Sequence, residues 1–345
     1  NAGNSIASGG NYNVAVGDEA GTAITTGDNN VALGYGAFKT STTGYSSVVV
    51  GTNAGDAITS GNQNTLIGFD SGTTLTTGSD NTAVGDRSFK LATTAATSVA
   101  IGGTALENTT TAADNVAVGW GSLRANTTGS NNTAVGKNAG NDVTTGVNNV
   151  LIGSLAGDAL TDADNNVAMG KESLGGDTLG SRSVAIGAFS LYTQNFTTAT
   201  NTYNTAVGYS AGESVTTGIS NTLIGGLTGD ALTDADQNVA VGNAALGTDT
   251  LGSKSTAIGT NALADQNFTT ATDTYNTAVG YNAGAATTTG FNNVLIGALA
   301  GDALTDADYN IVVGTSSLTT DTLGSRSTVI GYAALHNQNF TTATN

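Results

Sequence analysis

Three clusters of aspartates are the residues of this chain best suited to chemistry, because carboxylates at short spacings can share a cation. Each cluster reads Asp-Ala-Leu-Thr-Asp-Ala-Asp. Calcium takes about six to eight oxygens, and one cluster could supply part of that shell. The motif lacks the glycine and closing glutamate of an EF-hand loop, so a solvated acidic turn is the preferred interpretation, with calcium as the alternative. The candidate calcium ligands are Asp158, Asp162, Asp164, Asp230, Asp234, Asp236, Asp302, Asp306 and Asp308.

Other catalytic chemistry has little support in the sequence. The one histidine is His336, and Tyr192 and Ala264 stand at its equivalent positions. We find no paired catalytic carboxylates, no nucleophile motif and no phosphate-binding loop, and there is no cysteine for thiolate metal sites. We therefore expect a protein without enzymatic activity and without a required cofactor.

The elements that must position these residues follow from a glycine that recurs with a 17-residue period, as at Gly17, Gly34 and Gly51. We call it the repeat glycine. It is found in 19 copies, and two four-residue insertions interrupt the spacing. So short a period is typical of a solenoid, in which each coil buries its apolar side by stacking on its neighbours. The repeat predicts an all-β fold, a parallel β-solenoid (β-roll) of about 19 stacked 17-residue coils that forms one continuous rod over residues 1–345.

Each coil is expected to carry one short strand that ends at its repeat glycine. The residue before that glycine is aliphatic or, once, Met169, and the residue two positions earlier is always β-branched, as in Val14 and Thr65. The residue between them is Ala, Leu or Val. This period of two predicts a strand of about five residues. We expect the outer two residues to point into the coil and the middle residue to form a second apolar face, which would need cover from partner chains.

Two further columns predict how the coils pack. The residue four positions after the repeat glycine is either Gly or a large apolar residue. Gly there is paired with an aliphatic residue three positions later, as in Gly21 with Ile24, in eight of nine coils, and Thr287 is the exception. This pairing predicts one shared core pocket per coil that is filled from either position. The residue that opens each strand is Asn in 14 coils and Ser in five, which indicates a stacked hydrogen-bonded ladder or, alternatively, a polar binding array.

A longer repeat governs residues 137–345, and Tyr209–Gly280 is one full copy of it, whereas residues 1–136 form less uniform 17-residue coils. Each 72-residue super-repeat has one coil with a four-residue insertion, which we expect to project as a loop. Its aromatic residues are candidates for contact with a partner, although local packing is an equal alternative. They are Phe196 and Tyr203 in one coil, and Phe268 and Tyr275 in the next such coil.

The charges of the chain limit its partners. The formal net charge is −17, and only nine residues are Lys or Arg, so we expect neither nucleic acid nor an anionic membrane surface as a partner. Apolar runs are too short for membrane insertion. Arg182 stands five residues after Asp177, and Lys254 holds the equivalent position, so local ion pairs are expected there. The chain ends within a repeat, which suggests a segment of a longer protein.

The strand motif, as in Asn204-Thr205-Ala206-Val207-Gly208, resembles the head repeats of trimeric autotransporter adhesins, the YadA-like heads. The longer unit TTGxxNTAVGxxAG also looks like the repeats of phage tail-fibre proteins. The resemblance covers essentially the whole chain, although the 17-residue spacing is longer and more regular than is usual in adhesin heads. It implies a left-handed β-roll, three of which pack about a common axis as a homotrimer.

The favoured function is a structural extracellular fibre or shaft with adhesive capacity, on a cell surface or a virion surface. Lateral or end-to-end assembly into longer fibres fits that role, and the receptor is unknown. One alternative is a ligand-binding solenoid, an adhesin that recognises carbohydrate. The other is a single-chain ice-binding solenoid. It is disfavoured because the Thr-Thr pairs, such as Thr25-Thr26 and Thr76-Thr77, do not form a row of aligned Thr-x-Thr motifs on one face.

Overall fold

The computed structural model of the chain describes residues 2–3, 9–340 and 342–344. Its contacts divide the chain into two compact units, Asn1–Ala168 and Met169–Asn345, which are treated separately below. No helix occurs in the described part of the chain. The fold prediction is confirmed, because the molecule is all-β and consists of about 19 parallel coils that follow the 17-residue period of the sequence. The hand of the coils and the trimer stay predictions.

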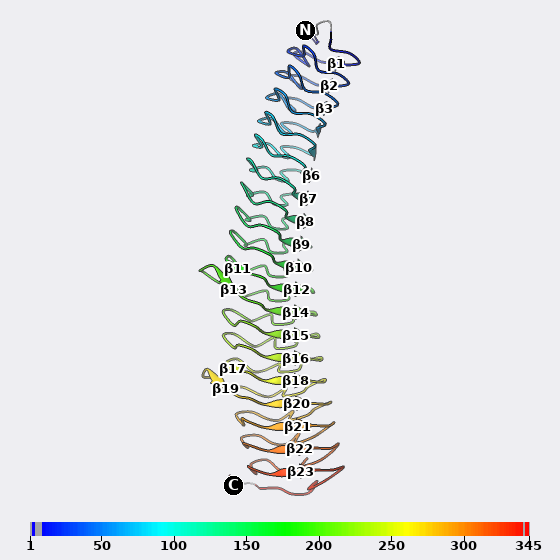
Figure 1. Cartoon of the computed structure of the whole chain (residues 1–345). Coiled ribbons are helices and arrows are strands. Elements are labelled where there is room, and N and C mark those ends of the chain that lie inside the picture. Colours follow the sequence, from blue (N-terminus) through cyan, green and yellow to red (C-terminus); the bar gives the residue numbers. More distant parts are fainter. Residues whose placement is uncertain (1, 4–8, 341, 345) are drawn as a thin grey trace. The chain divides into compact units, whose positions relative to one another are not determined.

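The first unit is a stack of coils that each contribute one three-residue strand to a parallel sheet, and Figure 1 shows these strands aligned along one side of the coils. Each strand residue pairs with its equivalent in the next coil, as Val14 with Val31, so equivalent side chains form straight columns. Its strands are β1 (Val14–Val16), β2 (Val31–Leu33), β3 (Val48–Val50), β4 (Thr65–Ile67), β5 (Thr82–Val84), β6 (Val99–Ile101), β7 (Val116–Val118), β8 (Thr133–Val135) and β9 (Val150–Ile152), and β10 (Val167–Met169) ends where the second unit begins.

The second unit repeats this arrangement and adds two short strand pairs. β11 pairs with β13 and β17 with β19, and Figure 1 shows both pairs on the side of the coils opposite the main strands. The main strands keep their pairing across each insertion, where Val184 pairs with Thr205 and Thr256 with Thr277. Its strands are β11 (Gly180–Ser181), β12 (Val184–Ile186), β13 (Thr200–Asn201), β14 (Thr205–Val207), β15 (Thr222–Ile224), β16 (Val239–Val241), β17 (Gly252–Ser253), β18 (Thr256–Ile258), β19 (Thr272–Asp273), β20 (Thr277–Val279), β21 (Val294–Ile296), β22 (Ile311–Val313) and β23 (Thr328–Ile330).

The repeat glycine is required because two coils meet backbone to backbone beside it. Gly85 has φ of +139°, a conformation that L side chains rarely adopt. A Cβ placed on Gly85 would lie 2.5 Å from the carbonyl oxygen of Gly102, its equivalent in the next coil. Any side chain here would push two coils apart, which explains why the glycine recurs at every coil.

The orientation of the strands is the reverse of the sequence-based prediction. The middle residue points into the coil, and Leu66 is fully buried, whereas its neighbour Ile67 points outward and is 37% exposed. In the second unit Leu223 is likewise buried and Ile224 is 39% exposed. The physical reason is the thin interior of a coil, in which one main strand faces only turns. One inward side chain per strand fills that space, so the outer two residues must face away from it.

The shared core pocket is confirmed. A Cβ placed on Gly55 would lie 2.9 Å from the Cδ1 atom of Ile58, and a Cβ on Gly229 would lie 2.8 Å from the Cδ1 atom of Leu232. The tip of the later side chain therefore occupies the volume that a side chain at the glycine position would fill. In the other coil type the earlier residue takes this volume, and Phe38 is fully buried in a coil whose later position is the small Ser41.

The Asn column forms the expected ladder. The side-chain oxygen of Asn64 accepts from the backbone N–H of Asn81 in the next coil at 3.1 Å. The amide group of Asn64 donates to the carbonyl of Gly78 at 2.9 Å. The side-chain oxygen and the side-chain amide group of Asn64 are thus both bonded to the next coil. The column therefore holds adjacent coils together and does not form a surface for ligands.

Candidate functional site

An unusual surface in each unit is formed by the outward residues of the main strands. We define the strand face as the residues one and three positions before each repeat glycine. At these positions the sequence has only Val, Ile, Leu, Met and Thr, with no charged residue in any coil. Many of the aliphatic side chains are more than a third exposed, including Leu33, Ile101 and Ile258. Exposed apolar surface of this regularity is typical of an interface rather than of a solvated sheet.

The insertions form a second surface, and the two alternatives for their aromatic residues divide between the residues. Phe196 and Phe268 are each 7% exposed, so the alternative of local packing holds for these two rings. Tyr203 and Tyr275 are 53% and 51% exposed and remain available for contact. The backbone N–H groups of the two phenylalanines donate to buried aspartates of the preceding coil, Asp177 and Asp249, and these bonds fix the backbone beside each buried ring.

Each insertion also adjoins a buried polar network, at the later pocket position where coils of the glycine type have an aliphatic residue. Asp177 is fully buried, and its Oδ1 atom accepts from the backbone N–H groups of Gly180 at 3.0 Å and Phe196 at 3.1 Å. Its Oδ2 atom accepts from the Gln194 amide at 2.5 Å. The Gln194 carbonyl in turn accepts from the Asn204 amide at 2.9 Å. The expected Arg182–Asp177 ion pair is not formed, because the Asp177 carboxylate is turned inward and Arg182 donates to the Tyr203 hydroxyl at 2.8 Å.

The burial of Asp177 predicts a pH effect on stability. Burial raises the pKa of this carboxyl above its ordinary value of 3.8, although the bonds from Gln194 and Phe196 oppose the shift. A carboxyl with a raised pKa binds its proton more tightly in the folded state, so its contribution falls as pH rises from 3.8 through the folded pKa. We expect Asp177→Asn to reduce this fall, as measured by thermal unfolding between about pH 3 and pH 8. A stability difference between the two proteins that is constant over that range would contradict the assignment.

The aspartate clusters do not assemble into cation sites. Asp164 accepts from the backbone N–H of Val147 at 2.8 Å, and Asp162 accepts from the Thr145 hydroxyl. In the next cluster Asp234 bonds Thr217 at 2.6 Å. Among the described residues, no group of three or more His, Cys, Asp or Glu side chains is placed to hold a metal ion. The clusters are therefore turns that bond the preceding coil, and the geometry gives no support to calcium. The same bonds recur from Asp236 to Ile219, from Asp306 to Thr289 and from Asp308 to Phe291.

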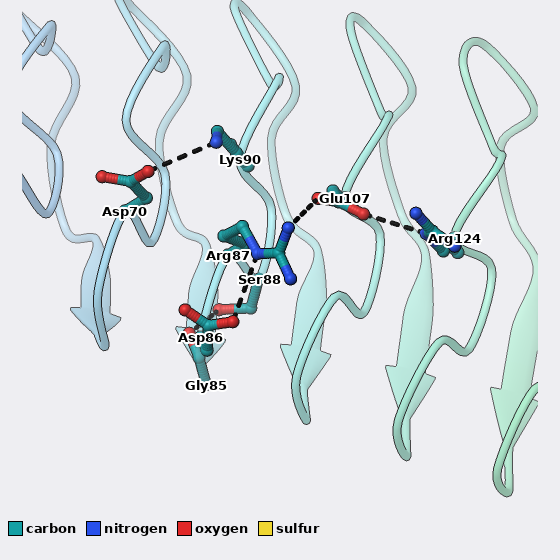
Figure 2. Close-up of polar contacts among 8 residues, drawn as sticks. All are labelled: Asp70, Gly85, Asp86, Arg87, Ser88, Lys90, Glu107 and Arg124. Carbon is teal, nitrogen blue, oxygen red and sulfur yellow. Dashed lines mark hydrogen bonds and ion pairs between the residues drawn. The ribbon is translucent and has the colours of Figure 1, made fainter.

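The first unit has one concentrated set of ion pairs, which Figure 2 shows. Glu107 is central, with Arg124 at 2.9 Å and Arg87 at 3.7 Å. Arg87 also pairs with Asp86 at 3.2 Å in its own coil. These residues lie on the turn that follows the strand, and the set links coils through a largely buried Glu107 and two half-exposed arginines, whose exposure keeps the contribution of each pair small. Lys90 and Asp70 form a further pair at 3.2 Å.

Threonines form a regular column in the first unit, more continuous than the Thr-Thr pairs indicated. The hydroxyl of Thr25 donates to the carbonyl of Thr42 at 2.9 Å, and Thr42 to Thr59 at 3.3 Å. The pattern continues to a bond from Thr144 to Thr161 at 3.1 Å. Because each of these hydroxyls already donates its proton to the next coil, it can only accept a hydrogen bond from water, and the column does not favour ice binding.

The described residues enclose no pocket, and none of their segments is a helix suited to crossing a membrane. His336 is exposed, with Nδ1 at 2.6 Å from the Thr319 hydroxyl. Comparisons with protein-family models and with curated proteins give no match. The proposals below therefore rest on the geometry of the exposed surfaces.

The residues of the strand face were predicted from the sequence to point into the coil, whereas they point outward. The sequence does contain a signal for their true orientation. Leu stands at the middle strand position only in coils with Gly four residues after the repeat glycine, as Leu66 with Gly72 and Leu151 with Gly157. A Cβ on Gly72 would lie 2.8 Å from the Cδ1 atom of Leu66. The middle strand residue thus lies in the coil interior, beside the core pocket. Because side chains alternate along a strand, the residues before and after it must point outward.

Proposed function

We propose that this chain is the shaft of an extracellular structural fibre, carried on a cell or virion surface, and that it acts as a homotrimer without catalysis. The observation that supports this function best is the uncharged strand face in every described coil. A parallel sheet is usually covered on both of its faces, and here one face is covered by the coil itself. A partner with the same repeat spacing is the simplest cover for the other face.

Copies of the same chain fit this requirement better than an unrelated partner. The strand face has the same chemistry in each coil, mostly with Val or Thr in one column and Val or Ile in the other, as in Thr222 and Ile224. A second copy presents matching columns at the same spacing, about 4.8 Å per coil. Apolar contacts would then repeat along the whole length of each unit, as a structural shaft requires.

A charge on the strand face should abolish the assembly. We expect Ile224→Asp to convert the trimer to monomers, because an unpaired carboxylate would be buried in an apolar interface at a cost of several kcal/mol per copy. Sedimentation velocity measures the change. Thr198→Asp adds the same charge in the exposed insertion loop and should leave the mass unchanged. Equal effects of the two substitutions would argue against the strand face as the interface.

The structural role is tested by removing one super-repeat. Deletion of residues 209–280 joins Gly208 to Tyr281 in unchanged register and removes four coils. A shaft should lose length, about 19 Å, with little change in thermal stability per coil. Electron microscopy and thermal unfolding measure the two quantities. A sharp loss of stability would contradict a modular shaft. Lateral or end-to-end joining of shafts would be visible in the same images.

A further inference from the structure

A cluster of aromatic residues around Phe189 lies at the surface of the second unit. Phe189 stands edge-to-face with Tyr192, with ring centroids 5.9 Å apart, and with Tyr209, at 6.1 Å. The Nζ atom of Lys171 lies 5.1 Å from the Phe189 ring centroid. Tyr209 is 60% exposed and Tyr192 37% exposed. The half-buried Phe189 ring thus contacts two exposed tyrosine rings and one ammonium group, on the turn that follows the strand.

The fold does not need this cluster. At the equivalent positions of the next super-repeat, Asn261 and Ala264 replace Phe189 and Tyr192, and Asn243 replaces Lys171. The strands there pair in the same parallel register, as β16 does with β18. Exposing aromatic rings to water has a cost, and the neighbouring super-repeat shows that the solenoid forms without them. A role in binding accounts for their presence.

We propose that this cluster, Lys171, Phe189, Tyr192 and Tyr209, binds a neutral polysaccharide of equatorially substituted pyranose units. The flat C–H face of such a sugar packs on exposed aromatic rings, and its hydroxyls need nearby donors and acceptors. Tyr209 and Tyr192 offer hydroxyls that bond no other group in the described part of the chain. The Lys171 ammonium and the Glu172 carboxylate, 3.2 Å apart, add a donor and an acceptor beside the rings.

The surroundings favour this ligand over other classes. Glu213 takes the position of Tyr192 in the following coil, and the chain has a net charge of −17, so polyanions such as nucleic acids are repelled. The surface is open, because no pocket is present among the described residues, which suits a long chain lying across rings more than a small molecule that needs enclosure.

Cellohexaose and chitohexaose are suitable probes, because both consist of neutral units with equatorial substituents. We expect isothermal titration calorimetry to show one site per chain for at least one of them. The double variant Phe189→Asn/Tyr192→Ala uses the residues that the next super-repeat already has, so it should fold and should weaken binding by about tenfold or more. Tyr281→Ala changes the equivalent of Tyr209 where no cluster exists and should leave binding unchanged.

Absence of binding to both oligosaccharides, or equal binding by the double variant, would overturn the proposal. Loss of binding in Tyr281→Ala would also overturn it, because the site would then lie elsewhere. Sedimentation velocity of the double variant separates this proposal from the trimer. A mass equal to that of the unmodified chain together with lost binding supports a glycan site, whereas a lower mass would identify the cluster as a contact between copies.

Discussion

Replacement of a single repeat glycine, Gly280→Ala, is expected to destabilise the second unit by about 3–5 kcal/mol. Gly280 has φ of +141°, which strains any residue with a Cβ. The added Cβ would also lie 2.5 Å from the carbonyl oxygen of Gly297 and 2.6 Å from its carbonyl carbon. Neither atom can move without separating two coils. Urea unfolding followed by far-UV circular dichroism measures the loss.

Gly226→Ala is the matched control for this prediction. Gly226 lies in the same unit, and the nearest atom to a Cβ there would be the Asn243 amide nitrogen at 3.4 Å, an ordinary contact. We expect a change of less than about 0.5 kcal/mol. If the two alanine variants unfolded at the same urea concentration, close backbone approach would not be the reason for the 17-residue repeat.

The second large effect concerns the shared core pocket. Phe38→Gly should destabilise the first unit by about 3–5 kcal/mol, because it empties a fully buried volume. Adding Ser41→Ile to that variant recreates the Gly21 and Ile24 arrangement and should restore most of the loss. The second change also removes the Ser41 hydroxyl, which is buried without a hydrogen-bond partner. Denaturant unfolding of the single and double variants gives the coupling energy.

Ser41→Ile alone provides the control. With Phe38 still in place the pocket is full, so the added side chain should overpack the coil and cost about 1–3 kcal/mol. Two destabilising single changes should therefore become nearly neutral when combined. Additive losses in the double variant would show that the two positions fill separate volumes, in conflict with the close approach of glycine and aliphatic residues seen in the other coil type.

The sequence predicted the backbone of the fold because its strongest constraints repeat. The repeat glycine, which is needed where coils meet, occurs in all 19 coils, and the pairing of the two pocket positions occurs in all but the coil of Gly284 and Thr287, so both constraints are visible in one sequence. The direction of the strand was harder. An alternating pattern with aliphatic residues on both faces has no polar side to mark the exterior, so only the association of Leu66 with Gly72 indicated which residue points inward.

The surface sites could be predicted only in part. Tyr203 and Phe196 lie in one insertion and look equivalent in sequence, but a backbone bond to Asp177 turns the phenylalanine inward. The cluster around Phe189 depends on contact with Tyr209, a side chain at a different position of the next coil. Such neighbours follow from the register of the stacked coils, and a four-residue insertion lies between them.

The native mass of the chain tests the central claim most directly, namely that the strand face is covered by copies of the same chain. Sedimentation equilibrium should give three times the chain mass of 33.8 kDa, and the mass should be the same in calcium and in chelator because the aspartate clusters form no cation site among the described residues. A mass of one chain at micromolar concentration would contradict the account, since the apolar strand face would then be stable in water without cover.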